Sequence, residues 1–237
     1  MNAFILAAGF GKRMGELTKN TCKPMLSIDG IRLIDYSLYL VNSWGLQKIW
    51  INTHYHSEKI ANHLKQFKNL NLFISEEREK ILGTAGGIRT ALPDSDLNTK
   101  LVLINPDTIL LPSQDFRLKT DLPLGSKIHL YLSPFPDGTN YTKIKLDSHN
   151  KVIMGDGNLF YIGLAIIDSS ILSPLNKNEY YDLSDIFKTL SETGEISGEI
   201  FLGKVIDVGT KELWEKLQNQ NLFEFDREKI LNFLKSL

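Results

Sequence analysis

The sequence predicts an α/β fold in which an open mixed sheet is flanked by helices and carries an inserted antiparallel region. Apolar runs of strand length alternate with segments of helical periodicity through the first 105 residues, which is typical of strands joined by helical crossovers. The middle of the chain then changes to closely spaced apolar runs separated by turn residues, which indicates antiparallel pairing. The 237 residues, 42% of them hydrophobic, suffice for one large domain with a substantial core.

The first part of the chain predicts a βαβαβ order. An apolar run ends at Leu6, and apolar residues then recur at helical spacing over residues 31–44, where Gly45 stops the helix. A second helix is expected over residues 58–67, with Ser57 as its N-cap. The other expected elements are strands over residues 48–53, 70–75 and 100–105 and a short helix that ends at Leu92.

The later part of the chain predicts the inserted antiparallel region and the closing helices. Strands are expected over residues 127–133, 141–147, 151–154, 161–168 and 204–208, and helices over 183–193 with Asp182 as cap, after Thr210, and from Asp226 onward. Such a sheet is Rossmann-like, and ligands bind outside the carboxyl ends of its strands. The turn after Leu6 and the carboxylate of Asp107 both follow strand ends, so we expect them on one rim of the sheet.

Composition limits the kinds of partner and the compartment. The charges nearly balance, with 27 Lys and Arg against 28 Asp and Glu, so no global field favours nucleic acid or an anionic membrane. Cys22 is the only cysteine, which excludes an internal disulfide and fits a reducing compartment. We interpret it as a buried thiol. Without a signal-peptide pattern or a membrane-length apolar segment, we expect a cytoplasmic protein.

A glycine turn with two cations follows the first strand. Gly9 and Gly11 allow backbone amides to approach an anion closely, while Lys12 and Arg13 supply positive charge. The turn lacks the third glycine of a dinucleotide fingerprint, because Met14 stands there, and it lacks the Ser or Thr of a Walker loop. It therefore predicts polyphosphate binding of another type, with a structural turn as the alternative.

Two further segments carry candidate binding residues. Lys23 precedes the rigid Pro24 and adds a third cation. Residues 83–87 combine three glycines with two small residues ahead of a helix, a surface that a flat nucleobase could approach closely. A tight strand-to-helix turn is the rival interpretation of that run.

Two carboxylates are candidates for a metal. Asp107 follows a buried strand, and Asp207 interrupts an apolar one, where a charge is costly unless it is paired or metal-bound. Mg²⁺ is typically held by one or two carboxylates together with phosphate oxygens. The histidines at 54, 56 and 63 do not match the spacing of a zinc motif, so we interpret them as surface or packing residues.

Taken together, these motifs resemble the sugar-1-phosphate nucleotidylyltransferases. The matching elements are Leu6-Ala7-Ala8-Gly9-x-Gly11-x-Arg13-Met14, Lys23-Pro24, Leu82-Gly83-Thr84-Ala85-Gly86-Gly87, Asp107 and Asp207-Val208-Gly209-Thr210. They occur in family order and span most of the chain. The segment from Ser197 to Thr210 looks most like the N-acetylmuramate-1-phosphate uridylyltransferase branch, and the mannose-1-phosphate and heptose-1-phosphate guanylyltransferases are almost as similar.

The resemblance implies a cytoplasmic, Mg²⁺-dependent enzyme that transfers a nucleotidyl group from an NTP, with UTP or GTP favoured, to a sugar 1-phosphate, and that supplies cell-wall or surface polysaccharide precursors. It implies one domain over residues 1–237, with a nucleotide-binding half over 1–110, a sugar-binding half over 111–203, and a second metal ligand and the last helices over 204–237. Arg13, Lys23, Asp107 and Asp207 would be catalytic, and both aspartates would hold Mg²⁺. The nucleotide would contact Leu6, Ala8, Gly9, Gly11, Lys12, Arg13, Lys23, Gly83, Gly86 and Asn105, and the sugar would contact Gly138, Asn140 and Gly163.

One departure from the family pattern leaves alternatives open. Pro106 stands where the family usually has glycine, which removes an N–H and fixes φ beside the expected sugar position. A non-catalytic protein that binds nucleotide sugars is therefore a second hypothesis. A glycosyltransferase ranks third, because Asn105 stands where its usual D-x-D pattern requires an acid. The base, the sugar and the oligomeric state are not determined by the sequence.

Overall fold

The computed structural model describes residues 1–136, 140–218 and 224–236, and the chain divides into two compact units. Unit 1 comprises residues 1–2, 82–104 and 112–203, and unit 2 comprises residues 3–81, 105–111 and 204–237. Both units are assembled from separate stretches of sequence, so neither is an independent segment of chain, in agreement with a single domain. Residues 82–104 lie with 112–203. The predicted division into a nucleotide-binding and a sugar-binding half stays a prediction.

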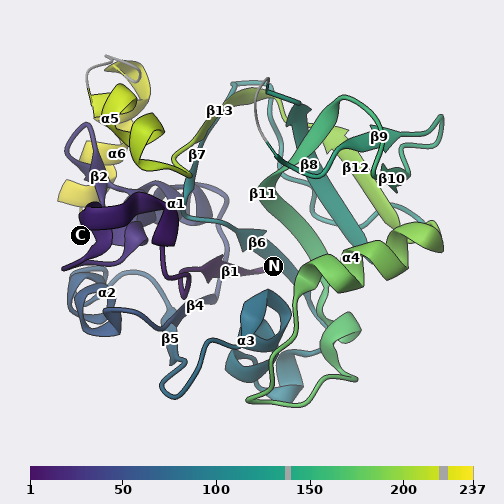
Figure 1. Cartoon of the computed structure of the whole chain (residues 1–237), viewed down its shortest axis with the longest axis horizontal. Coiled ribbons are helices and arrows are strands. Elements are labelled where there is room, and N and C mark those ends of the chain that lie inside the picture. Colours follow the sequence, from purple (N-terminus) through teal and green to yellow (C-terminus); the bar gives the residue numbers. More distant parts are fainter. Residues whose placement is uncertain (137–139, 219–223, 237) are drawn as a thin grey trace. The chain divides into compact units, whose positions relative to one another are not determined.

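Unit 2 contains a parallel sheet whose strands are joined by helices (Figure 1). Ala3 pairs with Ile49 and Leu6 with Asn52, so the first strand ends level with the end of the second. Both strands are almost completely buried, which explains their continuous apolar sequences. The elements are β1 (Asn2–Leu6), α1 (Leu33–Ser43), β4 (Ile49–Thr53), α2 (Ser57–Leu64) and β5 (Leu72–Glu76).

The rest of unit 2 packs around a second apolar core. Met14, Ile109, Val208 and Ile230, which are far apart in the sequence, lie in one buried cluster. Trp214 fastens the C-terminal part by donating from Nε1 to the carbonyl of Ser27 at 3.1 Å. The elements are β2 (Ser27–Ile28), β3 (Ile31–Arg32), β7 (Thr108–Pro112), β13 (Gly203–Asp207), α5 (Lys211–Gln218) and α6 (Glu224–Lys235), with short 3₁₀ segments at Lys12–Thr18 and Lys23–Met25.

Unit 1 contains the strands of the predicted insertion. The ten-residue strand β11 pairs antiparallel with β6, β8 and β9, whereas β12 pairs parallel with β8. This mixture confirms the predicted α/β class with a mixed sheet. The strands are β6 (Lys100–Ile104), β8 (Ile128–Pro134), β9 (Ile144–Leu146), β10 (Val152–Met154), β11 (Leu159–Asp168) and β12 (Ile196–Ile200).

Unit 1 also contains two helices, α3 (Gly83–Ala91) and α4 (Leu183–Glu192), of which α4 contacts β10 and β12. In Figure 1, α4 crosses the strands β8, β11 and β12. Its N-cap is Asp182, whose carboxylate accepts from the backbone of Ser184 at 3.1 Å, as the sequence predicts. Two short 3₁₀ segments complete the unit, at Asp94–Asp96 and Ser169–Leu172.

Several local predictions were wrong. Ser57 is the first residue of α2 and not its cap, because His56 adopts a left-handed conformation (φ 53°) before it, and the Ser57 hydroxyl donates to Glu76 instead. The helix expected from residue 31 begins at Leu33, since Ile31 and Arg32 form a small strand. The glycines of 83–87 lie inside α3 rather than ahead of it. The strands β7 and β12 were not anticipated.

No helix within the described ranges is long and apolar enough to span a membrane.

Candidate functional site

The glycine turn of unit 2 stands at the surface between two buried anchors. Ala8 and Met14 are buried, whereas Gly9, Phe10, Lys12 and Arg13 are exposed. Arg13 makes no ion pair or hydrogen bond with any residue that the structure describes, so its guanidinium is available to an anion. Its exposure fits the predicted role in gripping phosphate.

Gly11 joins this turn to Lys23. It has a left-handed backbone (φ 64°), and a Cβ added to it would lie 3.1 Å from Cβ of Lys23 and 3.2 Å from Cγ2 of Thr18. Thr18 also donates to the carbonyls of Gly11 and Gly15, at 3.3 and 3.2 Å. Position 11 requires glycine for two reasons. Its left-handed backbone disfavours other residues, and the close packing leaves no room for a side chain.

Lys23 forms a largely buried ion pair with Asp107. Its side chain is only 9% exposed, and Nζ lies 2.8 Å from Oδ2 of Asp107, a contact between residues 84 positions apart. The pair is short enough for a charge-assisted hydrogen bond. Burial of the lysine would be costly without this partner, so the ion pair explains why a cation is retained beneath the turn.

Asp107 is positioned by a turn between β6 and β7. The amide of Thr108 donates to the carbonyl of Asn105 at 3.3 Å, which places Pro106 at the second position of a four-residue turn. Proline is favoured at that position because its fixed φ suits the turn. The departure from glycine at residue 106 therefore has a structural explanation, and it does not displace the carboxylate from Lys23.

Asp207 lies on the neighbouring strand. The amide of Val208 donates to the carbonyl of Asp107 at 2.9 Å, so the two acidic residues stand beside each other at adjoining ends of β7 and β13. The carboxylate of Asp207 reaches over Gly209, where an added Cβ would lie 2.8 Å from Oδ1 and 2.9 Å from Oδ2. Gly209 thus leaves the space that the carboxylate occupies.

This pair fits a divalent cation in part. Two carboxylates from adjacent strands, one of them beside a lysine, are a donor set that suits Mg²⁺ when phosphate oxygens complete the shell. Within the described residues, no group of three or more His, Cys, Asp or Glu side chains is arranged to hold a metal without such help. A divalent cation at this pair would need further ligands, such as phosphate oxygens, and its binding stays a prediction.

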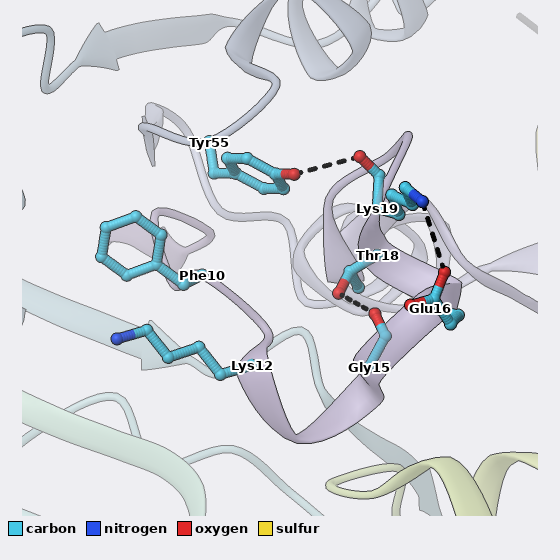
Figure 2. Close-up of a pocket in the computed structure, with 7 residues that line it drawn as sticks. All are labelled: Phe10, Lys12, Gly15, Glu16, Thr18, Lys19 and Tyr55. Carbon is cyan, nitrogen blue, oxygen red and sulfur yellow. Dashed lines mark hydrogen bonds and ion pairs between the residues drawn. The ribbon is translucent and has the colours of Figure 1, made fainter.

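A pocket of about 380 Å³ opens beside the glycine turn (Figure 2). Figure 2 shows Phe10, Lys12 and Tyr55 on one side, with the Tyr55 hydroxyl directed at the carbonyl of Lys19, a hydrogen bond of 3.1 Å. Its lining carries two ammonium groups and one carboxylate, so it favours an anion. The lining residues are Phe10, Lys12, Gly15, Glu16, Thr18, Lys19 and Tyr55.

Two buried polar residues behind the turn were missed by sequence reasoning. Asn52 accepts a hydrogen bond from the amide of Ala7 at 2.9 Å, and its own amide donates to Oε1 of Glu77 at 2.7 Å. Both side chains are buried. The signal that could have found Asn52 is its place at the end of an apolar run, where a polar residue must have a partner.

Cys22 and the histidines have the structural roles expected for them. Cys22 is fully buried, and desolvation by burial raises the pKa of its thiol to about 11, so it is not a thiolate near neutral pH. His63 pairs with the buried Asp35, whereas His54 donates to the carbonyl of Glu77. His56 lies beside Glu58.

The glycine run of unit 1 is covered by its own chain. A Cβ on Gly83 would lie 2.4 Å from the carbonyl oxygen of Tyr181, and a Cβ on Gly86 would lie 2.2 Å from that of Glu179. The amides of Ala85 and Gly86 both donate to Tyr181, at 3.0 and 3.1 Å. These glycines therefore have a packing role, and their predicted contact with a nucleobase stays a prediction.

The residues predicted for sugar contact lie in or near unit 1. Gly163 occupies a buried, left-handed position (φ 80°) where the pairing of β11 with β8 is irregular. Asn140 is exposed, and Gly138 lies outside the described residues.

The remaining residues predicted for nucleotide contact lie in unit 2. Asn105 is half-buried and begins the turn that carries Asp107, while Leu6 and Ala8 flank the start of the glycine turn. The structure alone assigns no ligand to these positions.

An α/β fold that brings a glycine turn, a buried lysine and two adjacent carboxylates together is typical of enzymes that act on nucleoside triphosphates. Residues 3–120 match the family model of the MobA-like NTP transferase domain. The match covers about half of the chain, and together with the relatives below it confirms the nucleotidyltransferase class expected from its motifs.

Two curated relatives and one solved structure are similar to the chain over most of its length. The chain is 29% identical to the N-acetylmuramate alpha-1-phosphate uridylyltransferase of Neisseria meningitidis serogroup B, over 89% of this chain and 94% of that protein. It is 27% identical to the D-glycero-alpha-D-manno-heptose 1-phosphate guanylyltransferase of Aneurinibacillus thermoaerophilus, over 93% and 98%. The solved structure of HddC from Yersinia pseudotuberculosis, complexed with GMP-PN, has a TM-score of 0.70 at 21% identity, over 92% of this chain and 97% of that one, and shares the fold.

Proposed function

We propose that this protein transfers a nucleotidyl group from an NTP to a sugar 1-phosphate, giving a nucleotide sugar and pyrophosphate. The observation that carries the proposal is the continuous set of contacts from Gly11 through Lys23 to Asp107, with Asp207 on the adjoining strand. The related enzymes of Neisseria and Aneurinibacillus are named for uridylyl and guanylyl transfer to sugar 1-phosphates, which supports the same class of substrates here.

The reaction needs positioning and charge more than covalent chemistry. An oxygen of the sugar phosphate attacks the α-phosphorus of the NTP, the bond from that phosphorus to the bridging oxygen breaks, and pyrophosphate leaves with the electron pair. The two reactants are anions that repel each other. Arg13 and Lys12 bind the triphosphate, and Lys23 stabilises the charge that develops at the reacting phosphate.

Asp107 and Asp207 would hold Mg²⁺, which supplies charge neutralisation at the phosphate oxygens when bound. Lys23 has a second role in this arrangement. Its ion pair with Oδ2 of Asp107 orients one carboxylate, while its Cβ packs closely against Gly11 in the turn. Positive charge from the protein and from the metal would then act on the same phosphate group.

The substrates can be identified by a matrix of four NTPs against a panel of sugar 1-phosphates with Mg²⁺, in which pyrophosphate release is measured. We expect release in at least one combination, with UTP or GTP favoured because the two named relatives use uridylyl and guanylyl groups. Binding of nucleotide sugars without pyrophosphate release in any combination would favour a non-catalytic binding protein instead.

The metal assignment has its own test. Asp107→Asn and Asp207→Asn each keep the size of the side chain and remove its charge, so we expect kcat to fall by about 100-fold or more with the fold intact. Asp35→Asn, a buried carboxylate of the same unit that pairs with His63, is the matched control and should keep kcat. Near-normal activity in either site variant, with unchanged dependence on Mg²⁺, would remove that residue from the metal site.

A further inference from the structure

The glycine turn of unit 2 has little packing of its own. A Cβ added to Gly9 would meet nothing within 4 Å, and Phe10, Lys12 and Arg13 are exposed. Glycine also has the largest conformational freedom of any residue. A turn that must present amides and cations to a triphosphate therefore depends on contacts at its ends to keep one conformation.

The first such contact is made by Asn52. It pairs with Leu6 at the last register position of β1 and β4, and its Oδ1 accepts from the amide of Ala7, the first residue beyond the ladder, at 2.9 Å. Asn52 is 3% exposed, so water does not replace this bond. Its own Nδ2 donates to Oε1 of Glu77 at 2.7 Å, which fixes the amide orientation.

The second contact reaches the middle of the turn. The carbonyl of Glu77 accepts from Nδ1 of His54 at 2.5 Å, and since a carbonyl can only accept, Nδ1 must carry the proton. The His54 ring packs edge-to-face against Phe10 at 5.1 Å between centroids. Phe10 stands between the two glycines, and Nζ of Lys12 lies 5.3 Å from the centre of its ring.

Both contacts converge on one residue. Glu77 is 4% exposed, and its side chain supports Asn52 while its backbone supports His54. Its amide also donates to the carbonyl of Thr53 at 2.8 Å, which continues the pairing of β4 and β5 by one residue. A buried carboxylate is costly for the fold. The carboxylate of Glu77 supports the start of the turn through Asn52, and its backbone carbonyl supports the middle through His54.

We propose that Glu77 is a positioning residue for the glycine turn, acting through Asn52 on Ala7 and through His54 on Phe10. The inference rests on the proposed function in one respect, since it takes the turn to be the triphosphate grip. Glu77 would touch neither substrate nor metal. It would set the geometry in which Gly9 to Arg13 meet the phosphates.

The first arm of the test measures nucleotide affinity by calorimetry with Mg²⁺ and each NTP. Glu77→Ala removes the acceptor of Asn52, and we expect the Kd to rise by about 10- to 100-fold, as for a misplacement of about 1 Å in a binding group. Glu77→Gln keeps Oε1 as an acceptor and should restore the Kd to within about threefold of the wild type. If Glu77 only stabilised the fold, Glu77→Ala would bind nucleotide with wild-type affinity once the folded fractions were equal. Glu77→Gln would then have no loss of affinity to rescue.

The second arm is independent of any ligand. Hydrogen–deuterium exchange of the free protein should show faster exchange at the amides of residues 7–14 in Glu77→Ala and Asn52→Ala. The double variant should differ little from either single one, because both act through the same link to Ala7. Asp35→Asn is the matched control, since it removes a buried charge from the same unit without contact with this network, and it should leave exchange at 7–14 unchanged.

The outcomes separate this inference from the proposed function. A folded Glu77→Ala variant with wild-type exchange at residues 7–14 and wild-type affinity would overturn the positioning role. A wild-type protein that binds no NTP would overturn the proposed function, while the exchange arm would still decide whether Glu77 holds the turn. If Glu77→Ala does not fold, Phe10→Leu removes the ring contacts with His54, Tyr55 and Lys12 at a partly exposed position and must still accelerate exchange in the turn.

Discussion

Two glycine-rich segments of this protein have similar compositions and opposite surroundings. In unit 2, Gly9 stands in open space, and a side chain there would meet nothing within 4 Å. In unit 1, a side chain on Gly86 would overlap the carbonyl oxygen of Glu179 at 2.2 Å. The first segment leaves its backbone accessible to a ligand, whereas the second has its backbone approached by another part of the same chain.

The difference extends to the backbone amides that begin each helical segment. Gly11 caps the 3₁₀ segment Lys12–Thr18 without any side-chain cap, and the cations beside it are exposed. The amides of Ala85 and Gly86 are instead satisfied by Tyr181. Glycine therefore permits close approach in both places, but only the turn in unit 2 has amides and charges that face solvent.

The largest expected effect is a difference in stability between two variants that add one methyl group, one in each segment. Gly86→Ala places a Cβ against a backbone oxygen that cannot rotate away, and we expect a loss of about 3 kcal/mol in the free energy of unfolding, measured by urea denaturation. Gly9→Ala should change stability by less than about 0.5 kcal/mol. Equal losses in the two variants would show that the two surroundings do not differ as described.

The next effect separates ligand binding from packing. Arg13→Ala removes an exposed guanidinium and should lower kcat/KM by about 30-fold, equivalent to about 2 kcal/mol, with no change in the urea midpoint. Lys65→Ala, which removes another exposed cation of unit 2 far along the sequence from the turn, is the control and should keep full activity. An unchanged KM and kcat in Arg13→Ala would exclude it from the site.

The smallest expected effect tests the hydrogen bonds that connect the glycine run of unit 1 to the start of α4. The hydroxyl of Thr84 accepts from the amide of Leu183 at 2.8 Å and donates to Asp182 at 2.9 Å. Thr84→Val keeps the shape and removes both bonds, so we expect a loss of about 1 kcal/mol in unfolding free energy and an unchanged Kd for NTP. Thr84→Ser should retain most of the stability. A large change in Kd would instead support the predicted contact of this run with nucleotide.

Much of the fold was predictable because its signals are local. The continuous apolar run of β6 and the helical periodicity of α4 with its Asp182 cap are sufficient by themselves. The strand β7 was missed because Thr108–Pro112 follows a turn and ends at proline, a residue that counts against a strand because it cannot donate a backbone hydrogen bond. The Ser57 cap was wrong because the hydroxyl found a partner on β5, a contact that local sequence does not reveal.

The site was predictable only where charge marks it. Lys23, Asp107 and Asp207 are ionisable residues beside apolar runs, and each stands out for that reason. Their contacts join segments 84 or more positions apart, so the geometry came only from the structure. Asn52 and Glu77 belong to no recognisable motif. Glu77 lies near Glu76 and Glu79, and such a run of charged residues is typical of an exposed segment.

The discontinuous assembly of unit 2 has a consequence for synthesis on the ribosome. Its second core joins Met14 and Ile109 to Val208 and Ile230, contacts that close loops of about a hundred residues and so raise the contact order. At about 5–20 residues per second, several seconds pass between synthesis of Ile109 and arrival of the segment that covers it. During that interval the nascent chain exposes apolar surface, and Asp107 and Asp207 meet only after the segment around Asp207 has been synthesised.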